Sequence, residues 1–336
     1  MFFALTDDQQ EFGAAVRGYL AERFDLAAVH GLVEDAASDG NPATLWKAAG
    51  EQGWLAVTVP EEFDGLGLGL VEAQVIARAL GAGVAPGPWR GTVLAAEAIR
   101  LAGSEEQKAA WLPRLATGAA IGALASRGAA PGLLPAVEYG AIADVVVVPT
   151  GRLVTGASST PRGSYDGTVR LADVTAATVE ELPGANPEVG AEIRARAAVL
   201  VAADLVGIAR EALTRTVAYD RDRKQFGVPV GSFQAIKHTL ADLHCTITMA
   251  EHAALYAAHA VETGSDDAPL AVAVAKAKAG DAAAASTAAM IQYHGGIGYT
   301  WEHEAHLFYK RAKRLAGQWG DATAHRARIA ELTIGS

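Results

Sequence analysis

The sequence contains a single cysteine, Cys245, among 336 residues. One thiol cannot form an internal disulfide, and it cannot build a metal site that needs several thiolates. Basic side chains are also few, because 28 Lys and Arg face 38 Asp and Glu for a formal net charge of −10. Nucleic acids and anionic membranes are bound by concentrated basic surfaces, so we expect neither as a partner.

Long hydrophobic runs are missing as well. The most apolar stretch, residues 197–209, carries Asp204 and is too short to span a bilayer. The first eight residues, Met-Phe-Phe-Ala-Leu-Thr-Asp-Asp, hold neither a basic region nor a small-residue cleavage site, so we expect no signal peptide. The sequence therefore predicts a soluble protein of the cytoplasm.

The composition is that of a folded protein. Apolar residues make up 51% of the chain and charged residues 20%, which excludes disorder and allows a sizeable core. A chain of 336 residues exceeds the usual limit of about 250–300 for a single core, so we expect one large domain or two or three packed parts.

The first third of the chain has the pattern of helices. Thr6 with Gln9 three residues later resembles a capping box, and Ser104 with Gln107 resembles a second one. An apolar stripe at helical spacing follows the first box at Phe12, Val16, Tyr19 and Leu20. Further helices are predicted near residues 45–52, 71–82 and 90–102, with a glycine-rich loop at 65–69.

The pattern changes at about residue 120 and again near 190. Between them Gly, Pro, Ser and Thr are frequent, and residues 144–148 form a β-branched run typical of a strand. Helical periodicity then returns near 191–221, 232–262, 268–294, 301–316 and 321–332. This order predicts a mainly α fold with a small β insert, an α+β class rather than a doubly wound nucleotide fold.

Three familiar site patterns fail on inspection. Residues 295–298 read Gly-Gly-Ile-Gly, but Trp301 stands where a dinucleotide fingerprint needs its last glycine, and no strand precedes them. The histidine groups lack the spacing that places two ligands on one helix face, so we expect no metal; they are His238 with His244, and His303 with His306. The sequence has no G-x-S-x-G element, so nothing indicates a serine hydrolase.

Several separate motifs resemble one enzyme family. In the C-terminal half they are residues 219–229 (Tyr-Asp-Arg-Asp-Arg-Lys-Gln-Phe-Gly-Val-Pro), 232–234 (Ser-Phe-Gln), 240–243 (Leu-Ala-Asp-Leu) and 292–300 (Gln-Tyr-His-Gly-Gly-Ile-Gly-Tyr-Thr). Upstream, Gly53-Trp54 leads into Val-Pro-Glu-Glu at 59–62, and segment 104–113 follows. Together they resemble the acyl-CoA dehydrogenase family, and in particular the shortened subunit of actinobacterial heterotetrameric acyl-CoA dehydrogenases.

The resemblance implies an architecture and a reaction. The implied parts are an N-terminal helical domain at 1–118, a shortened middle β-domain at 119–188, and a C-terminal four-helix bundle at 189–336 that carries FAD-contact motifs. In this family FAD lies between subunits and the enzyme desaturates an acyl-CoA thioester. A carboxylate removes the α-proton, and the β-hydrogen leaves as hydride to the flavin.

The resemblance also implies which residues contact FAD, namely Arg223, Phe226, Gln234, Gln292, Gly295 and Gly296. The arginine can hold phosphate oxygens by charge-assisted hydrogen bonds, and the amides can donate and accept. Two alternatives stay open: Phe226 can simply pack in the core, and the glycine pair can simply end a helix.

Two departures from the family pattern bear on catalysis. The segment that holds the flavin ring in the same subunit is replaced by residues 125–132 (Ala-Ser-Arg-Gly-Ala-Ala-Pro-Gly). The two family positions for the base align with Trp319 and Ala197, which cannot accept a proton. The acids nearby in sequence read as helix-start or surface charges: Asp204, Glu302, Glu304 and Asp321. We therefore predict no catalytic residue in this chain.

Three hypotheses follow. The leading one is a subunit of a heteromeric acyl-CoA dehydrogenase of fatty-acid or steroid degradation, which supplies FAD contacts in trans. Its partners would be an acyl-CoA substrate, a homologous full-length subunit that carries the base, and an electron acceptor. The second is a self-sufficient homo-oligomer with a relocated base such as Asp321. The third is a non-redox acyl-CoA-binding or scaffold protein.

Overall fold

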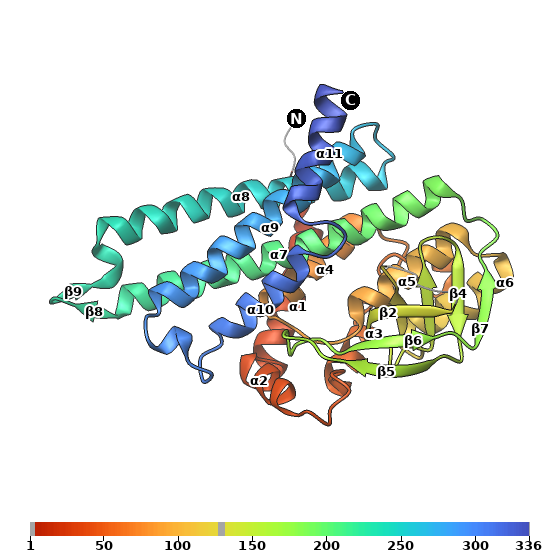
Figure 1. The fold of residues 1–336 in the computed structure, drawn as a ribbon, viewed down its shortest axis with the longest axis horizontal. Coiled ribbons are helices and arrows are strands. Elements are labelled where there is room, and N and C mark those ends of the chain that lie inside the picture. Colours follow the sequence, from red (N-terminus) through yellow and green to blue (C-terminus); the bar gives the residue numbers. More distant parts are fainter. Residues whose placement is uncertain (1–3, 127–131, 336) are drawn as a thin grey trace. The chain divides into compact units, whose positions relative to one another are not determined.

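The computed structural model describes residues 4–126 and 132–335 (Figure 1). Helices α1–α6 come first, strands β1–β7 follow, and helices α7–α11 complete the chain with a short hairpin, β8–β9, between α7 and α8. This order confirms the predicted α+β class. The chain forms two compact units, Met1–His30 with Gln74–Ala85 and Ala198–Ser336, and Gly31–Ala73 with Pro86–Ala197. The three-domain division at 118 and 188 stays a prediction.

The N-terminal helices begin where their capping residues predict. Thr6 Oγ1 accepts from the Gln9 amide at 3.3 Å, and Gln9 Oε1 accepts from the Thr6 amide at 3.0 Å. Ser104 and Gln107 repeat this exchange at 3.2 and 3.0 Å, so both predicted capping boxes are confirmed. The helices are α1 (Asp7–Arg23), α2 (Leu26–Glu34), α3 (Ala43–Glu51), α4 (Leu70–Ala82), α5 (Trp89–Ala102) and α6 (Glu105–Thr117).

Helix α2 is one element that the sequence pattern does not predict. It has nine residues, with Gly31 inside it and only Val29 fully buried. Asp25 caps its start, because the Asp25 Oδ1 accepts from the Ala28 amide at 3.0 Å. A pattern this short contains too few repeats to identify a helix.

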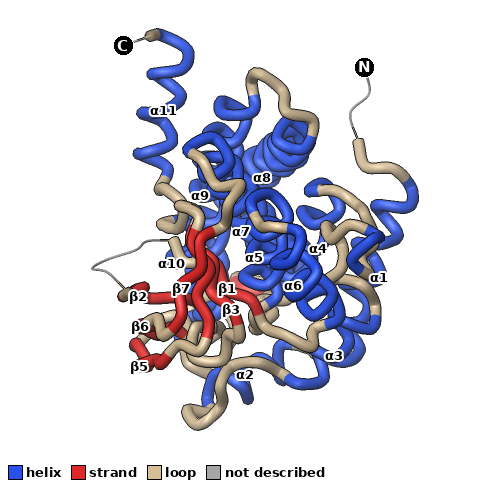
Figure 2. Tube along the Cα trace, turned by 90° about the vertical axis from the view of Figure 1, so that its right-hand side faces the viewer, coloured by secondary structure: helices blue, strands red, loops and turns tan. Residues whose placement is uncertain are grey.

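The β section consists of two small sheets. Its strands are β1 (Gly122–Leu124), β2 (Leu133–Glu138), β3 (Val145–Val148), β4 (Arg152–Thr155), β5 (Ser158–Arg162), β6 (Leu171–Thr175) and β7 (Thr178–Glu181). One sheet has the order β1-β3-β4-β7, with β1 parallel to β3 and the other pairs antiparallel. The other sheet is antiparallel in the order β2-β6-β5, and Figure 2 shows both sets of strands in red.

Strand β3 carries the core of this unit on both of its faces. Val145 and Val147 belong to a hydrophobic cluster that includes Ile99 of α5. Val146 and Val148 belong to a second cluster, which includes residues of both sheets such as Val174. Successive side chains of a strand point to opposite faces, so four consecutive valines identify a strand that is covered on both sides.

The C-terminal helices are long and alanine-rich. They are α7 (Pro187–Asp222), α8 (Gln234–Glu262), α9 (Ala268–Tyr293), α10 (Ala305–Ala316) and α11 (Ala322–Ile334). Helix α9 packs against α8, α10 and α11, and alanine accounts for more than half of its buried residues. Small side chains permit this close packing of helix on helix. No helix within the described residues is long and apolar enough to cross a membrane.

Candidate functional site

A tight hairpin follows α7 at one end of the helical bundle (Figure 1). Strand β8 (Lys224–Gln225) pairs with β9 (Val228–Pro229), and the turn between them is Phe226-Gly227. Both turn residues have positive φ, 51° and 81°, which is the geometry of a type I′ turn. Glycine adopts this conformation freely, whereas an aromatic residue in it is uncommon and strained.

Phe226 points into solvent. Its exposed fraction is 93%, so the alternative that it packs in the core of this chain is wrong. Its ring meets the ring of Phe233 edge to face, with 6.3 Å between centroids. An exposed aromatic residue held in a strained backbone conformation suggests a contact made outside this chain.

Arg223 and Gln234 stand at the two ends of the hairpin segment. The Arg223 carbonyl accepts from the Val230 amide at 2.7 Å, so its backbone closes the base of the hairpin. Both residues are exposed, and neither side chain has a hydrogen bond or ion pair with any described residue. Their polar groups are therefore available to a ligand.

The second predicted motif lies where α9 ends. Gln292 is exposed, and its side chain has no partner among residues 4–126 and 132–335. Gly295 has a φ of 63°, so the backbone conformation of the turn is enough to explain a glycine there. Gly296 has a φ of −56°, which any residue can adopt. A Cβ placed on either glycine would meet no heavy atom within 4 Å. The chain itself does not need a glycine at position 296.

A stacked pair of rings joins the two motifs. Tyr219, in the last turn of α7, stacks on His294 with 4.4 Å between centroids and 26° between planes. His294 stands between Gln292 and Gly295 in the chain. The structure thus brings the predicted residues of both motifs to the same end of the bundle. Tyr219 and His294 lie within the family motifs, but no pattern in the sequence distinguishes them from their neighbours.

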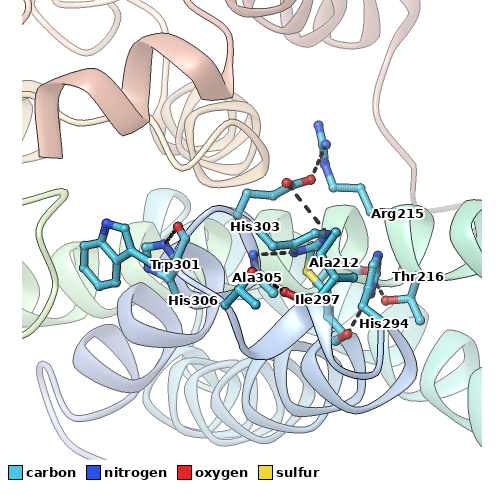
Figure 3. Close-up of polar contacts among 12 residues, drawn as sticks. Ala212, Arg215, Thr216, His294, Ile297, Trp301, His303, Ala305 and His306 are labelled. Carbon is cyan, nitrogen blue, oxygen red and sulfur yellow. Dashed lines mark hydrogen bonds and ion pairs between the residues drawn. The ribbon is translucent and has the colours of Figure 1, made fainter. Parts of the chain in front are cut away.

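His294 is held as a neutral imidazole. It is buried, and burial is the main cause that lowers its pKa. The hydrogen bond to the Met290 carbonyl and the charge of Glu304 raise the pKa, whereas His303 and Arg215 lower it. Because a carbonyl only accepts, the ring nitrogen 2.7 Å from the Met290 oxygen, Nδ1, carries the hydrogen. The ring centroid of His303 lies 4.5 Å from that of His294, and Figure 3 shows this cluster.

Asp220, beside Tyr219, is a buried acid that the sequence analysis missed. It is fully buried, and neither carboxylate oxygen accepts a hydrogen bond from any residue that the structure describes. Burial raises the pKa of Asp220 to about 6. A Cβ on Gly231 would lie 3.1 Å from the Asp220 carbonyl oxygen, so the segment after the hairpin packs directly on this turn of α7.

Four acids lie near the predicted base positions in the sequence. Two of them, the buried Asp204 and the half-buried Glu304, are engaged in ion pairs. Asp204 is bound by Arg311 through two hydrogen bonds of 2.8 and 3.3 Å. Arg215 donates to Glu304 at 3.0 Å (Figure 3). Burial pushes the pKa of Glu304 upward, but its own backbone amide, His303 and Arg215 outweigh burial and lower it.

The other two of these acids, Asp321 and Glu302, are exposed and accept hydrogen bonds from nearby residues. Asp321 caps α11, since its Oδ1 accepts from the Ala324 amide at 2.8 Å. The pKa of Glu302 is lowered by a hydrogen bond from its own backbone amide and by the Thr300 hydroxyl. Each of the four acids therefore has a structural contact.

The two positions at which the family resemblance predicts the base hold apolar side chains in this structure. Ala197 is fully buried. Trp319 is half-buried with a φ of 55°, and its carbonyl accepts from His325 Nε2 at 3.0 Å. The next carbonyl, of Gly320, accepts from the buried Lys276 ammonium at 2.9 Å. Of the replaced flavin-ring segment 125–132, residues 127–131 lie outside the described residues.

Comparisons with known proteins give concordant matches. The family model described as "Acyl-CoA dehydrogenase, N-terminal domain" matches residues 6–119, and "Acyl-CoA dehydrogenase, C-terminal domain" matches residues 195–333. Acyl-CoA dehydrogenase IpdE2 of Mycobacterium tuberculosis is 38% identical over 311 residues, covering 91% of each chain.

Two solved structures share the fold over nearly the full length. A chain of the ChsE4-ChsE5 complex from Mycobacterium tuberculosis superposes with a TM-score of 0.90 at 25% identity, covering 99% of each chain. A chain of the Tcur3481-Tcur3483 steroid ACAD, a G363A variant, superposes with a TM-score of 0.89 at 26% identity, covering 98% of each chain.

Proposed function

This chain belongs to the acyl-CoA dehydrogenase family, and on that premise we propose that it is one subunit of a heteromeric, FAD-dependent acyl-CoA dehydrogenase. The similar proteins ChsE4-ChsE5 and Tcur3481-Tcur3483 are each named for two components. The second is called a steroid ACAD, so we extend the proposal to a steroid or other bulky acyl-CoA thioester. An electron-accepting protein completes the expected set of partners.

One observation carries the proposal. Arg223, Gln234 and Gln292 expose side chains that have no partner in the described chain, and Gly296 leaves open space where a side chain would stand. A guanidinium, two amides and an accessible backbone are suited to the phosphates and hydroxyls of a dinucleotide. These residues fit FAD, and their exposure suits a cofactor held mainly by another chain.

The chemistry supplied by bound FAD is acceptance of the β-hydrogen of the acyl chain as hydride. The proposed tasks of this chain are to orient the cofactor through Arg223 and the two amides, and to cover it with Phe226. Removal of the α-proton needs a carboxylate within hydrogen-bond reach of it. Since the resemblance aligns Trp319 and Ala197 with the positions of that carboxylate, we assign it to the partner subunit.

Co-expression with a homologous full-length subunit tests the proposal. We expect the complex to be yellow and to desaturate its acyl-CoA, and the chain purified alone to be colourless and inactive. Yellow and active protein from this chain alone would contradict the proposal and favour a self-sufficient homo-oligomer. Colourless complex that binds acyl-CoA would favour the non-redox alternative.

Substitution of acids locates the base. Asp321→Asn keeps the helix cap, because Asn caps as well as Asp, and Glu302→Gln changes only an exposed acid. We expect each variant complex to turn over within about threefold of the parent, a barrier change of well under 1 kcal/mol. Replacement of the partner's glutamate should abolish turnover. A large loss from Asp321→Asn with flavin retained would place the base in this chain.

A further inference from the structure

Three helices pack closely away from the hairpin, near the labels α1, α4 and α7 in Figure 1, with α4 and α7 in backbone contact. A Cβ on Gly207 of α7 would lie 2.0 Å from the Arg78 carbonyl oxygen of α4. A Cβ on Gly13 of α1 would lie 2.7 Å from the side chain of Val75, one turn before Arg78. Glycine is required at position 207, where backbone atoms leave no room for a side chain, and a larger residue at position 13 would have to displace the Val75 side chain.

These crossings gather three arginines. Arg210 follows Gly207 by three residues on α7, Arg78 follows Val75 by three on α4, and Arg17 follows Gly13 by four on α1. Residues three and four apart lie on the same face of a helix, so each arginine stands one turn beyond a crossing point. All three belong to the same compact unit.

The Arg210 guanidinium is fixed in place. It donates to both carboxylate oxygens of Glu251 on α8, at 3.1 and 2.6 Å. It also donates to Thr248 Oγ1 and to His244 Nδ1, each at 3.0 Å. A guanidinium with this many partners is rigid, and among residues 4–126 and 132–335 Glu251 is the acid that binds it.

Arg78 is the unusual member. Its side chain is half-buried, yet it donates no hydrogen bond and forms no ion pair within residues 4–126 and 132–335. Burial lowers the pKa of Arg78, and the charges of Arg17 and Arg210 lower it further, against the attraction of Glu251. A desolvated guanidinium among like charges is costly unless an anion accompanies it.

We propose that Arg17, Arg78 and Arg210 form a binding site for a small phosphate-type dianion. Three guanidinium charges less the charge of Glu251 leave a net charge of +2, which matches phosphate or a phosphate monoester at neutral pH. In this site Arg210 is held in place by its partners. Arg78 has N–H donors without a partner in the described chain, and the exposed Arg17 lies on the solvent side. The site is separate from the proposed flavin contacts and needs none of them.

Calorimetric titration of the assembled protein with inorganic phosphate tests this site, against chloride at equal ionic strength. We expect saturable binding of one phosphate per chain. Arg78→Gln should weaken it about tenfold or more, the loss expected when a charge-assisted contact is removed. Arg328→Gln, which removes an exposed arginine of α11 in the same unit, is the matched control and should leave it unchanged.

Two further variants keep the outcome decisive. If Arg78→Gln fails to fold, the exposed Arg17→Gln should show the same direction of change. Glu251→Gln should tighten binding, because it removes the negative charge paired with Arg210 and acting on Arg78. Adenosine 5′-monophosphate is the second probe; tighter binding than phosphate would identify a monoester ligand, and equal binding would identify phosphate itself.

Three results would overturn the proposal. The first is phosphate binding no better than chloride. The second is an affinity that is unchanged in both Arg78→Gln and Arg17→Gln. The third is loss of subunit assembly in these variants with no phosphate binding in the parent, which would assign the arginines to a carboxylate of a partner protein.

Discussion

Asp220→Asn should make the protein less sensitive to pH, and the structure gives the size of the effect. Asp220 is buried without a hydrogen-bond partner in the described chain, and burial raises its pKa from 3.8 to about 6. The folded state therefore holds the proton more tightly than the unfolded state does. Each unit of difference is worth about 1.4 kcal/mol, so two units amount to about 3 kcal/mol.

The sign follows from proton binding. Below about pH 4 the carboxyl is protonated in both states and Asp220 adds nothing. Between about pH 4 and 6 only the unfolded state releases the proton, so stability falls as pH rises. Above pH 6 the penalty is complete, at about 3 kcal/mol. Asparagine keeps the shape and cannot ionise, so the variant should lack this decline.

Urea unfolding of the parent and of Asp220→Asn between pH 4 and 8 measures the difference directly. Other titrating groups cancel in that difference. Asp222→Asn, at an exposed acid two residues later, is the matched control for replacing a carboxylate by an amide in this turn. A flat difference for Asp220→Asn, or one in which the parent gains stability with rising pH, would refute the argument that burial dominates this carboxyl.

The remaining predictions concern the proposed flavin contacts. Arg223→Ala should leave the fold intact and weaken flavin retention of the complex by about 10- to 150-fold, with partial rescue by Lys, as measured by flavin absorbance at limiting FAD. Gly296→Val should abolish flavin binding with unchanged helical circular dichroism, because the chain itself leaves that space open; normal flavin content would show that nothing approaches there. Phe226→Asn should relieve the strained turn and raise stability by about 1 kcal/mol in thermal unfolding while loosening assembly; a loss of stability would contradict the strain argument.

Local signals in the sequence were sufficient for most of the fold. The capping pairs at Thr6 and Ser104 and the four valines of β3 each encode their element within a few residues. What the sequence could not predict depends on contacts between distant segments. The stacking of Tyr219 on His294 and the burial of Asp220 arise only when α7, α9 and the segment after the hairpin meet.

The same distinction holds for the candidate site. Family motifs predict Arg223, Gln234 and Gln292 as flavin contacts, because such motifs are continuous in the chain, and these assignments stay predictions. The exposure of Phe226 could not be inferred, since an aromatic residue after a helix packs inward as readily as outward. Only the positive φ values of the Phe226-Gly227 turn explain why the ring projects into solvent.

The loop that carries Trp319 is held by hydrogen bonds to its main-chain carbonyls. His325 and Lys276 hold the carbonyls of residues 319 and 320, and none of these bonds involves the Trp319 side chain. These main-chain contacts do not depend on which side chain occupies position 319. Two subunits that descend from one ancestral fold can therefore differ in the side chain at such a position. They can then take different roles in a shared site while the surrounding backbone stays the same.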